Sequence, residues 1–204
     1  MSSDNDHHAG SDGLNTLREL LCSISEIPEA EWTWLASNIE PREYPAQATL
    51  FRPGAVDHSL HFLSNGLVRY YYLTDNGLER NHTFAAEHSL VACLRAFAGV
   101  APCQFAIEAL EPTRTLLIPA DIVRVMDERH ACWLKLKLRL MEHVALRKEA
   151  REAEFLLESA PDRYRLFRAR FSALEDRIPQ YHIASYLGIT PVALSRIRKR
   201  INHG

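Results

Sequence analysis

The feature that most limits the fold is a series of short apolar segments between Tyr44 and Ile118, separated by turn-forming residues. Two separators contain the pairs Asn65-Gly66 and Asn76-Gly77. Such pairs favour tight hairpins because both central residues of the turn need a positive φ. The segments between the turns are Thr49–Phe51, Leu60–Leu63, Leu67–Leu73, Arg80–Phe84, Gln104–Leu110 and Thr113–Ile118. Short strands and turns in this order predict a β-barrel or jelly roll.

Helical periodicity flanks these strands on both sides. Apolar residues from Leu14 to Ile39 recur at helical spacing and predict one or two short helices. A long helix is predicted from Ala120 to about Leu157, and the sequence Ser159-Ala160-Pro161 ends it. The polar residues 1–13 are predicted to form a disordered tail. The fold class is therefore α+β.

The long helix carries two apolar stripes. One consists of Leu134, Leu138, Met141 and Ala145, and the other of Leu136, Leu140 and Val144. So wide an apolar surface suggests a partner helix, and hence a dimer. The alternative is that the helix simply packs on the barrel. Polar residues follow Met141 on the first stripe, so any coiled-coil seam is short.

The charge distribution points to an anionic partner. The chain has a net charge of −2, but residues 161–204 hold nine Lys and Arg against three Asp and Glu. A basic final quarter on an acidic body suggests nucleic acid, and the alternative is a solvated basic face.

Other features exclude several classes. No apolar run is long enough to span a membrane, and the polar start has no signal-peptide core, which predicts a cytoplasmic protein. Reducing conditions would then keep the four cysteines as thiols: Cys22, Cys93, Cys103 and Cys132. No CxxC pair, metal-ligand set or nucleophile–base set is recognisable, so we predict no metal, no cofactor and no enzymatic activity.

The segment 180–200 has the pattern of a helix-turn-helix. Ile183 and Leu187 form the apolar face of a first helix, and Gly188 stands where that helix must end. Thr190 is a good N-cap and Pro191 a good first residue for the second helix. The second helix turns Leu194 and Ile197 inward and carries a basic set of residues, Arg196, Arg198, Lys199 and Arg200.

The run from Ile183 to Arg198 resembles the C-terminal DNA reader of the Crp/Fnr family of bacterial regulators, and the resemblance extends over residues 44–202. It implies an N-terminal β-roll sensor of the jelly-roll type, a long dimerisation helix and a C-terminal winged-helix-type helix-turn-helix domain. The corresponding domains are a tail at 1–13, the effector-sensing β-roll with its N-terminal helices at 14–125, the dimerisation helix at 126–158 and the reader at 159–204. The implied partners are double-stranded DNA with a palindromic operator, a second copy of the chain and RNA polymerase.

The resemblance also assigns roles on the second helix. Arg196 falls where the family reads guanine, Ser195 and Lys199 would contact phosphate or neighbouring bases, and Val192 replaces a base-reading glutamate. The operator is therefore expected to differ from the best-known sites of the family. The full set of predicted DNA-binding residues is Gln180, Thr190, Pro191, Val192, Ser195, Arg196 and Lys199.

The nucleotide-binding residues of the family are missing. Its cyclic-nucleotide binders carry a Gly-Glu-Leu run and, about ten residues later, an Arg-Ser/Thr-Ala run. These align here with Ala92-Cys93-Leu94 and Cys103-Gln104-Phe105, so both charged ligands are lost. We expect weak or no binding of cyclic AMP and an unknown effector. The candidate effector-pocket residues are Ala92, Cys93, Leu94, Arg95, Cys103 and Gln104.

Two questions stay open at this stage. Cys93 and Cys103 could sense thiol chemistry or a small molecule, or they could be two small buried residues. The chain could also be a ligand-binding signalling module that does not act on DNA, although the basic second helix argues against this. The hinge near Ser159–Arg163 is the expected bistable element.

Overall fold

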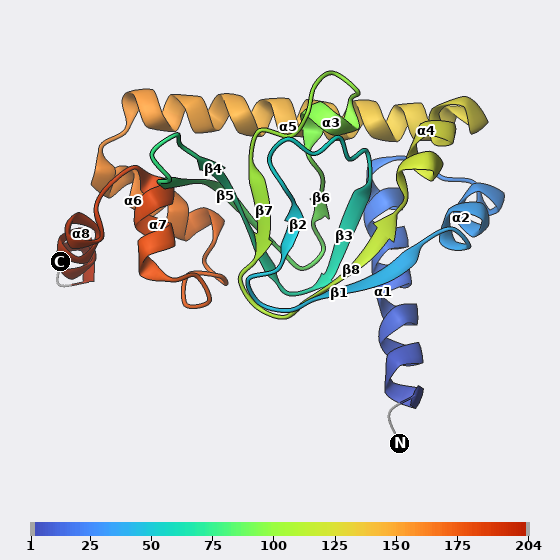
Figure 1. Cartoon of the computed structure of the whole chain (residues 1–204), viewed down its shortest axis with the longest axis horizontal. Helices are drawn as coiled ribbons and strands as arrows, with labels where there is room; N and C mark the ends of the chain where they lie inside the picture. Colours follow the sequence, from blue (N-terminus) through green and yellow to red (C-terminus); the bar gives the residue numbers. More distant parts are fainter. Residues whose placement is uncertain (1–2, 203–204) are drawn as a thin grey trace. The chain divides into compact units, whose positions relative to one another are not determined.

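The computed structural model, which describes residues 3–202, contains two four-stranded sheets (Figure 1). Their strand orders are β1-β8-β3-β6 and β2-β7-β4-β5. The strands are β1 (Glu40–Tyr44), β2 (Thr49–Phe51), β3 (Leu60–Asn65), β4 (Leu67–Leu73), β5 (Glu79–Ala86), β6 (Leu90–Val91), β7 (Ala106–Ala109) and β8 (Thr113–Ile118). The prediction of a mixed α+β chain with a β-roll is confirmed.

Helices flank the sheets in sequence. They are α1 (Ser3–Ile24), α2 (Glu29–Ala36), α3 (Leu94–Phe97), α4 (Ala120–Arg129), α5 (Ala131–Leu157), α6 (Ala160–Arg170), α7 (Gln180–Leu187) and α8 (Pro191–Asn202). None of the helices in the described range is long and apolar enough to cross a bilayer. Residues 158–202 contain no strand, so the described part of the predicted winged-helix-type domain has its helices but no wing. Residues 171–179 form successive turns there, because they lack an alternating apolar pattern.

Residues 3–13 differ from the expected disordered tail, since α1 already begins at Ser3. Leu17 and Leu21 anchor this helix in the core. Once such a helix is nucleated, each residue added at its start gains a backbone hydrogen bond, so polar residues can extend it.

The chain divides into two compact units, which we name the body unit and the reader unit. The body unit comprises residues 1–69 and 84–143, and the reader unit comprises residues 70–83 and 144–204. The end of β4, the following turn and the start of β5 thus belong with the C-terminal helices, as does the second half of α5. These divisions fall at other residues than the predicted domain boundaries.

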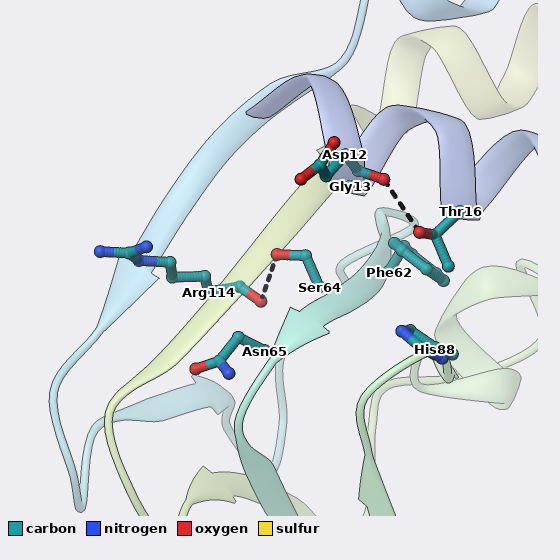
Figure 2. A pocket seen from close by; sticks show the side chains of 8 residues that line it. All are labelled: Asp12, Gly13, Thr16, Phe62, Ser64, Asn65, His88 and Arg114. Carbon is teal, nitrogen blue, oxygen red and sulfur yellow. Dashed lines mark hydrogen bonds between the residues drawn. The ribbon is translucent and has the colours of Figure 1, made fainter. Parts of the chain in front are cut away.

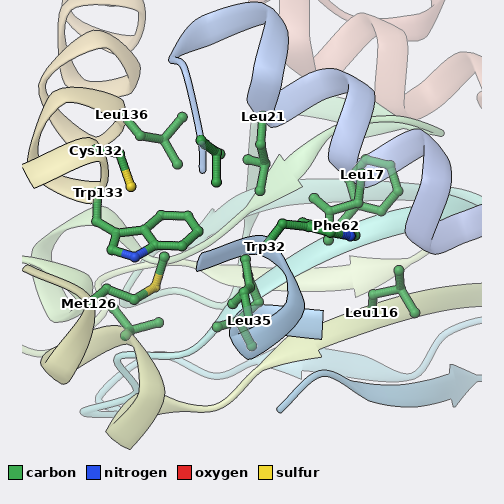
Figure 3. Close-up of a cluster of buried hydrophobic side chains, with 13 residues drawn as sticks. Leu17, Leu21, Trp32, Leu35, Phe62, Leu116, Met126, Cys132, Trp133 and Leu136 are labelled. Carbon is green, nitrogen blue, oxygen red and sulfur yellow. The ribbon is translucent and has the colours of Figure 1, made fainter. Parts of the chain in front are cut away.

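The core of the body unit lies where helices from both ends of its sequence meet the sheet of β3 and β8. Side chains of α1, α2, α4 and α5 converge there with Phe62 and Leu116 (Figure 3). Glu31 of α2 lies buried beside this core and accepts hydrogen bonds of 2.9 Å from Trp133 Nε1 and from Arg129 Nε.

A break at His130 divides the helix that was predicted to run unbroken from Ala120 to Leu157. His130 has an extended backbone, and its Nδ1 accepts a hydrogen bond of 3.1 Å from the backbone N–H of Cys132. This cap starts α5. The change of direction lets Met126 of α4 and Trp133 of α5 both reach the same core.

Candidate nucleic-acid interface

Helices α7 and α8 are joined by the tight turn that the sequence predicts. Gly188 ends α7 in the left-handed conformation, with φ 70° and ψ 30°. The backbone N–H of Ile189 donates to the Ala184 carbonyl at 3.0 Å, which satisfies one of the free carbonyls at the helix end. The turn thus sets the angle at which α8 leaves α7.

The start of α8 is capped as predicted. Thr190 Oγ1 accepts a hydrogen bond of 3.2 Å from the backbone N–H of Ala193, and Pro191 is the first helical residue. Leu194 is fully buried and Ile197 is half-buried. One face of α8 is therefore held against the rest of the reader unit, and the opposite face is left to solvent.

The predicted DNA-binding residues all lie at exposed positions. Val192, for example, is 61% exposed, although valine is apolar. The exposed set is Gln180, Thr190, Pro191, Val192, Ser195, Arg196 and Lys199. Six of these seven residues belong to α8 or its N-cap, and Gln180 begins α7. The structure thus places the basic residue types that bind phosphate and guanine on the outer surface of a capped helix.

Arg198 has a different environment from Arg196 on the same helix. Its guanidinium lies 3.7 Å from Glu175, which also pairs with Arg168 at 3.2 Å. The hydroxyl of buried Tyr164 donates to the same carboxylate, and burial together with Glu175 raises the pKa of Tyr164 to about 12. Arg198 therefore ties α8 to the segment 171–179, and through Glu175 to α6, a role that its place in a basic run did not reveal.

The end of α5 is tied to the reader helices by a buried carboxylate. Glu154 is 8% exposed and pairs with Arg151 at 2.8 Å and with Arg170 of α6. Arg170 also donates to the hydroxyl of Tyr186 in α7 at 2.9 Å. Burial alone would raise the pKa of Glu154, but the two guanidinium groups outweigh it and hold the pKa below its usual value.

The start of β5 also contacts α7 within the reader unit. The backbone N–H of Asn81 donates to Ser185 Oγ at 2.9 Å, and its side-chain amide lies 3.0 Å from Nδ1 of buried His182. Ser185 in turn donates to the Glu79 carbonyl at 3.2 Å. Sequence reasoning missed these contacts, because nothing in the local pattern of β5 or α7 signals a partner about a hundred residues away.

The two apolar stripes of α5 have different surroundings. Leu136 is buried in the core of the body unit, and Leu140 packs against it. On the other stripe, Leu134 is 50% exposed and Leu138 is 60% exposed. Met141 is half-buried and Ala145 is exposed on that same stripe. The structure therefore leaves the predicted dimer stripe available for a partner helix.

The candidate effector residues are only partly brought together. Cys93 and Cys103 are buried and joined by a disulfide, with their Cα atoms 5.7 Å apart, while Cys22 and Cys132 are free. The structure differs from the expectation of four thiols at this pair, because the fold places the two sulfur atoms in bonding distance. Arg95 and Gln104 are exposed, and Ala92 and Leu94 are half-buried.

A small pocket lies elsewhere on the body unit, between α1 and the strand β3. It has a volume of about 210 Å³, and its lining includes Asp12, His88 and Arg114 (Figure 2). Phe62 and His88 also line it, and their rings stack with 6.4 Å between their centres. None of the predicted effector residues lines this pocket.

This architecture is shared with a known domain family and with several solved structures. Residues 41–130 match the model of the cyclic nucleotide-binding domain family. FixK2 from Bradyrhizobium japonicum is similar in structure, with 15% identity, a TM-score of 0.71 and coverage of 81% of this chain and 85% of that chain. The catabolite activator protein of Thermus thermophilus is 19% identical, with a TM-score of 0.55 and coverage of 90% and 87%.

A CooA variant from Carboxydothermus hydrogenoformans is 16% identical, with a TM-score of 0.65 and coverage of 90% of this chain and 83% of that chain. No curated protein sequence matches the chain. The fold and the matched segment define a cyclic nucleotide-binding type of β-roll followed by a helical C-terminal region. The chain has the architecture of the Crp/Fnr regulators, as the sequence resemblance implied.

Proposed function

We propose that this chain is a sequence-specific transcription regulator of the Crp/Fnr type, which binds a palindromic operator as a homodimer and is not an enzyme. The observation that carries the proposal is the outer face of α8. That helix is capped, buried along Leu194, and exposes Val192, Ser195 and Arg196 to solvent. An arginine on such a face can donate two hydrogen bonds to guanine in the major groove.

The exposed stripe of α5 supports a dimer. A two-fold axis along this helix would bury Leu134 and Leu138 of both copies and present two α8 helices to DNA. A palindromic site with half-sites about one helical turn apart follows from that symmetry. We expect such a regulator to act in the cytoplasm, with RNA polymerase as a further partner.

The effector is proposed to be something other than cyclic AMP. A cyclic phosphate needs a cation and its ribose an acceptor, and the aligned positions hold Cys93 and Cys103 instead. In that alignment, the two residues that the disulfide joins stand where the family has its two charged ligands. A signalling module that does not act on DNA would have no need for the exposed basic face of α8.

Selection of DNA from a random pool by the full-length protein tests the proposal, with Arg196→Ala compared in parallel. The matched control is Arg124→Ala, which removes the same charge from an exposed position on α4. We expect a palindrome for the unchanged protein and the control. Arg196→Ala should lose about 1–3 kcal/mol of discrimination at one guanine of each half-site. Binding that weakens with salt but shows no DNA sequence preference in any of the three proteins would contradict the proposal.

A further inference from the structure

The bridge between Cys93 and Cys103 closes a short loop in the body unit. Cys93 directly precedes α3, and Cys103 follows it after an irregular stretch, so the bond joins the two ends of the segment 93–103. Both sulfur-bearing residues are almost fully buried, with exposures of 0% and 2%. The segment between them reaches the surface, where Val100 is 75% exposed. The bond therefore lies at the buried base of an exposed loop.

Few other bonds hold this loop in place. Within the described chain, the backbone N–H groups of residues 97–101 all donate to carbonyls of residues 93–96. The base is paired to the body only at Cys103, whose carbonyl accepts from Gly54 at 2.7 Å and whose N–H donates to Ala55 at 2.9 Å. Once its covalent tie is cut, the loop is held by these few hydrogen bonds and by the packing of Ala96 and Phe97, so its local opening costs less free energy.

The loop also touches α5, the helix that carries the proposed dimer stripe. Phe97 packs against the core cluster that contains Trp133 and Leu136, and the ammonium group of Lys137 lies 5.9 Å from the centre of its ring. Ala96 beside it is buried. A displacement of α3 would therefore change the contacts on the inner side of α5.

We propose that Cys93 and Cys103 form a reversible dithiol–disulfide site, which is oxidised by low-molecular-weight disulfides of the glutathione type. The oxidised pair holds the segment 93–103 in place, and the reduced pair releases it. The proposal rests on the proposed function in one respect. A regulator of DNA works in a reducing compartment, where disulfides are usually transient and redox-sensing rather than structural.

The chemistry is a pair of thiol–disulfide exchanges. One protein thiolate attacks oxidised glutathione, forms a mixed disulfide and releases one glutathione thiolate. The second protein thiolate then attacks the protein sulfur of the mixed disulfide, forms the Cys93–Cys103 bond and releases the second glutathione thiolate. The two protein thiols lose two electrons in total, and their two protons end on the two glutathione molecules. Excess reduced glutathione drives the same steps backwards.

The test equilibrates the full-length protein in glutathione buffers from fully reduced to mostly oxidised, and then alkylates all free thiols for peptide mapping by mass spectrometry. We expect labelling at Cys93 and Cys103 to disappear together in one transition that dithiothreitol reverses. Labelling of exposed Cys22 serves as the internal control. The proposal is overturned if the pair stays reduced in every buffer, or if the bridge persists in the most reducing one.

Hydrogen exchange of the two forms gives a second readout that needs no substitution. On reduction, amide protection in residues 94–101 should fall by about tenfold or more, because the opened loop regains chain entropy. Strand β8 serves as the reference, and the first turns of α5 should respond with the loop. Equal exchange in both forms would contradict release of the loop. Neither readout uses DNA, so failure of this site and failure of the proposed function can be told apart.

Discussion

The turn between α7 and α8 depends on Gly188, whose φ of +70° is unfavourable for residues with a side chain. A Cβ atom at this position would lie 3.2 Å from Cε1 of Phe155. That ring is 46% exposed, and it contacts two guanidinium groups, those of Arg151 at 4.2 Å and Arg163 at 5.3 Å from its centre. Gly188 therefore meets both a backbone and a packing requirement.

Gly188→Ala is expected to lower the free energy of unfolding by about 1–2 kcal/mol from the backbone requirement alone, with a further loss from the contact with Phe155. Gly77→Ala is the matched control, since its φ is +79° and a Cβ there meets nothing within 4 Å. Urea denaturation of both variants measures the difference. Equal losses in the two proteins would show that the contact with Phe155 has no energetic weight.

At the scale of single elements, α5 has two unlike faces, with Leu136 in the core and Leu138 60% exposed. Leu138→Glu is expected to convert a dimer into a monomer. Burial of a leucine contributes about 1.5–3 kcal/mol, and two-fold symmetry places the residue in the interface twice. Sedimentation velocity over a range of concentrations measures the change in the dimer dissociation constant.

Ala150→Glu is the control for this substitution, because Ala150 is exposed on α5 but lies off the stripe. It introduces the same carboxylate into the same helix. If both variants dimerise as tightly as the unchanged chain, the dimer interface lies elsewhere.

The sequence predicted elements whose signals are local and missed those that depend on distant partners. The turn at Gly188 and the N-cap at Thr190 were predictable, since capping follows from neighbouring residues alone. Strand β1 was not, because all but its last residue are exposed and its pattern does not alternate. It forms because its backbone pairs with β8, with Glu40 opposite Leu117 at one end and Tyr44 opposite Thr113 at the other.

The features of the candidate site also divide into those that the sequence predicted and those that it did not. The exposed positions of Val192 and Arg196 followed from helical periodicity, and the structure agrees with them. The bridge between Cys93 and Cys103 did not follow, because its formation depends on how the intervening loop folds back. The contact of Asn81 with His182 depends on the fold of the whole reader unit.

At the scale of the whole molecule, buried His61 should make stability depend on pH. Burial lowers its pKa to about 4, with Asp57 opposing and Arg42 adding to the shift. The imidazole of His61 therefore binds a proton near pH 6.5 in the unfolded chain, but only near pH 4 in the folded chain. Stability is fully present above pH 6.5 and falls as the pH drops towards 4, by about 2 kcal/mol at pH 5 from this residue.

His61→Leu is expected to flatten the dependence of unfolding free energy on pH between 7 and 5. The reason is that unfolding of the variant takes up about one proton fewer in this range. Its absolute stability will also fall, since Thr115 Oγ1 loses its partner at 3.0 Å. Urea denaturation at several pH values separates the change in pH dependence from the overall loss of stability. His58→Leu provides a half-buried control, and an unchanged slope in His61→Leu would contradict the prediction.

The membership of the β4–β5 turn in the reader unit limits how such proteins can exchange parts in evolution. A new reader cannot simply be joined after Ser159, because the Asn81 side chain of the resident β-roll must still match the residue at position 182. Recombination after Ser159 would leave the buried amide of Asn81 facing an unrelated helix. Successful chimaeras should therefore inherit the hairpin and α7 from one parent, although 101 residues separate Asn81 from His182.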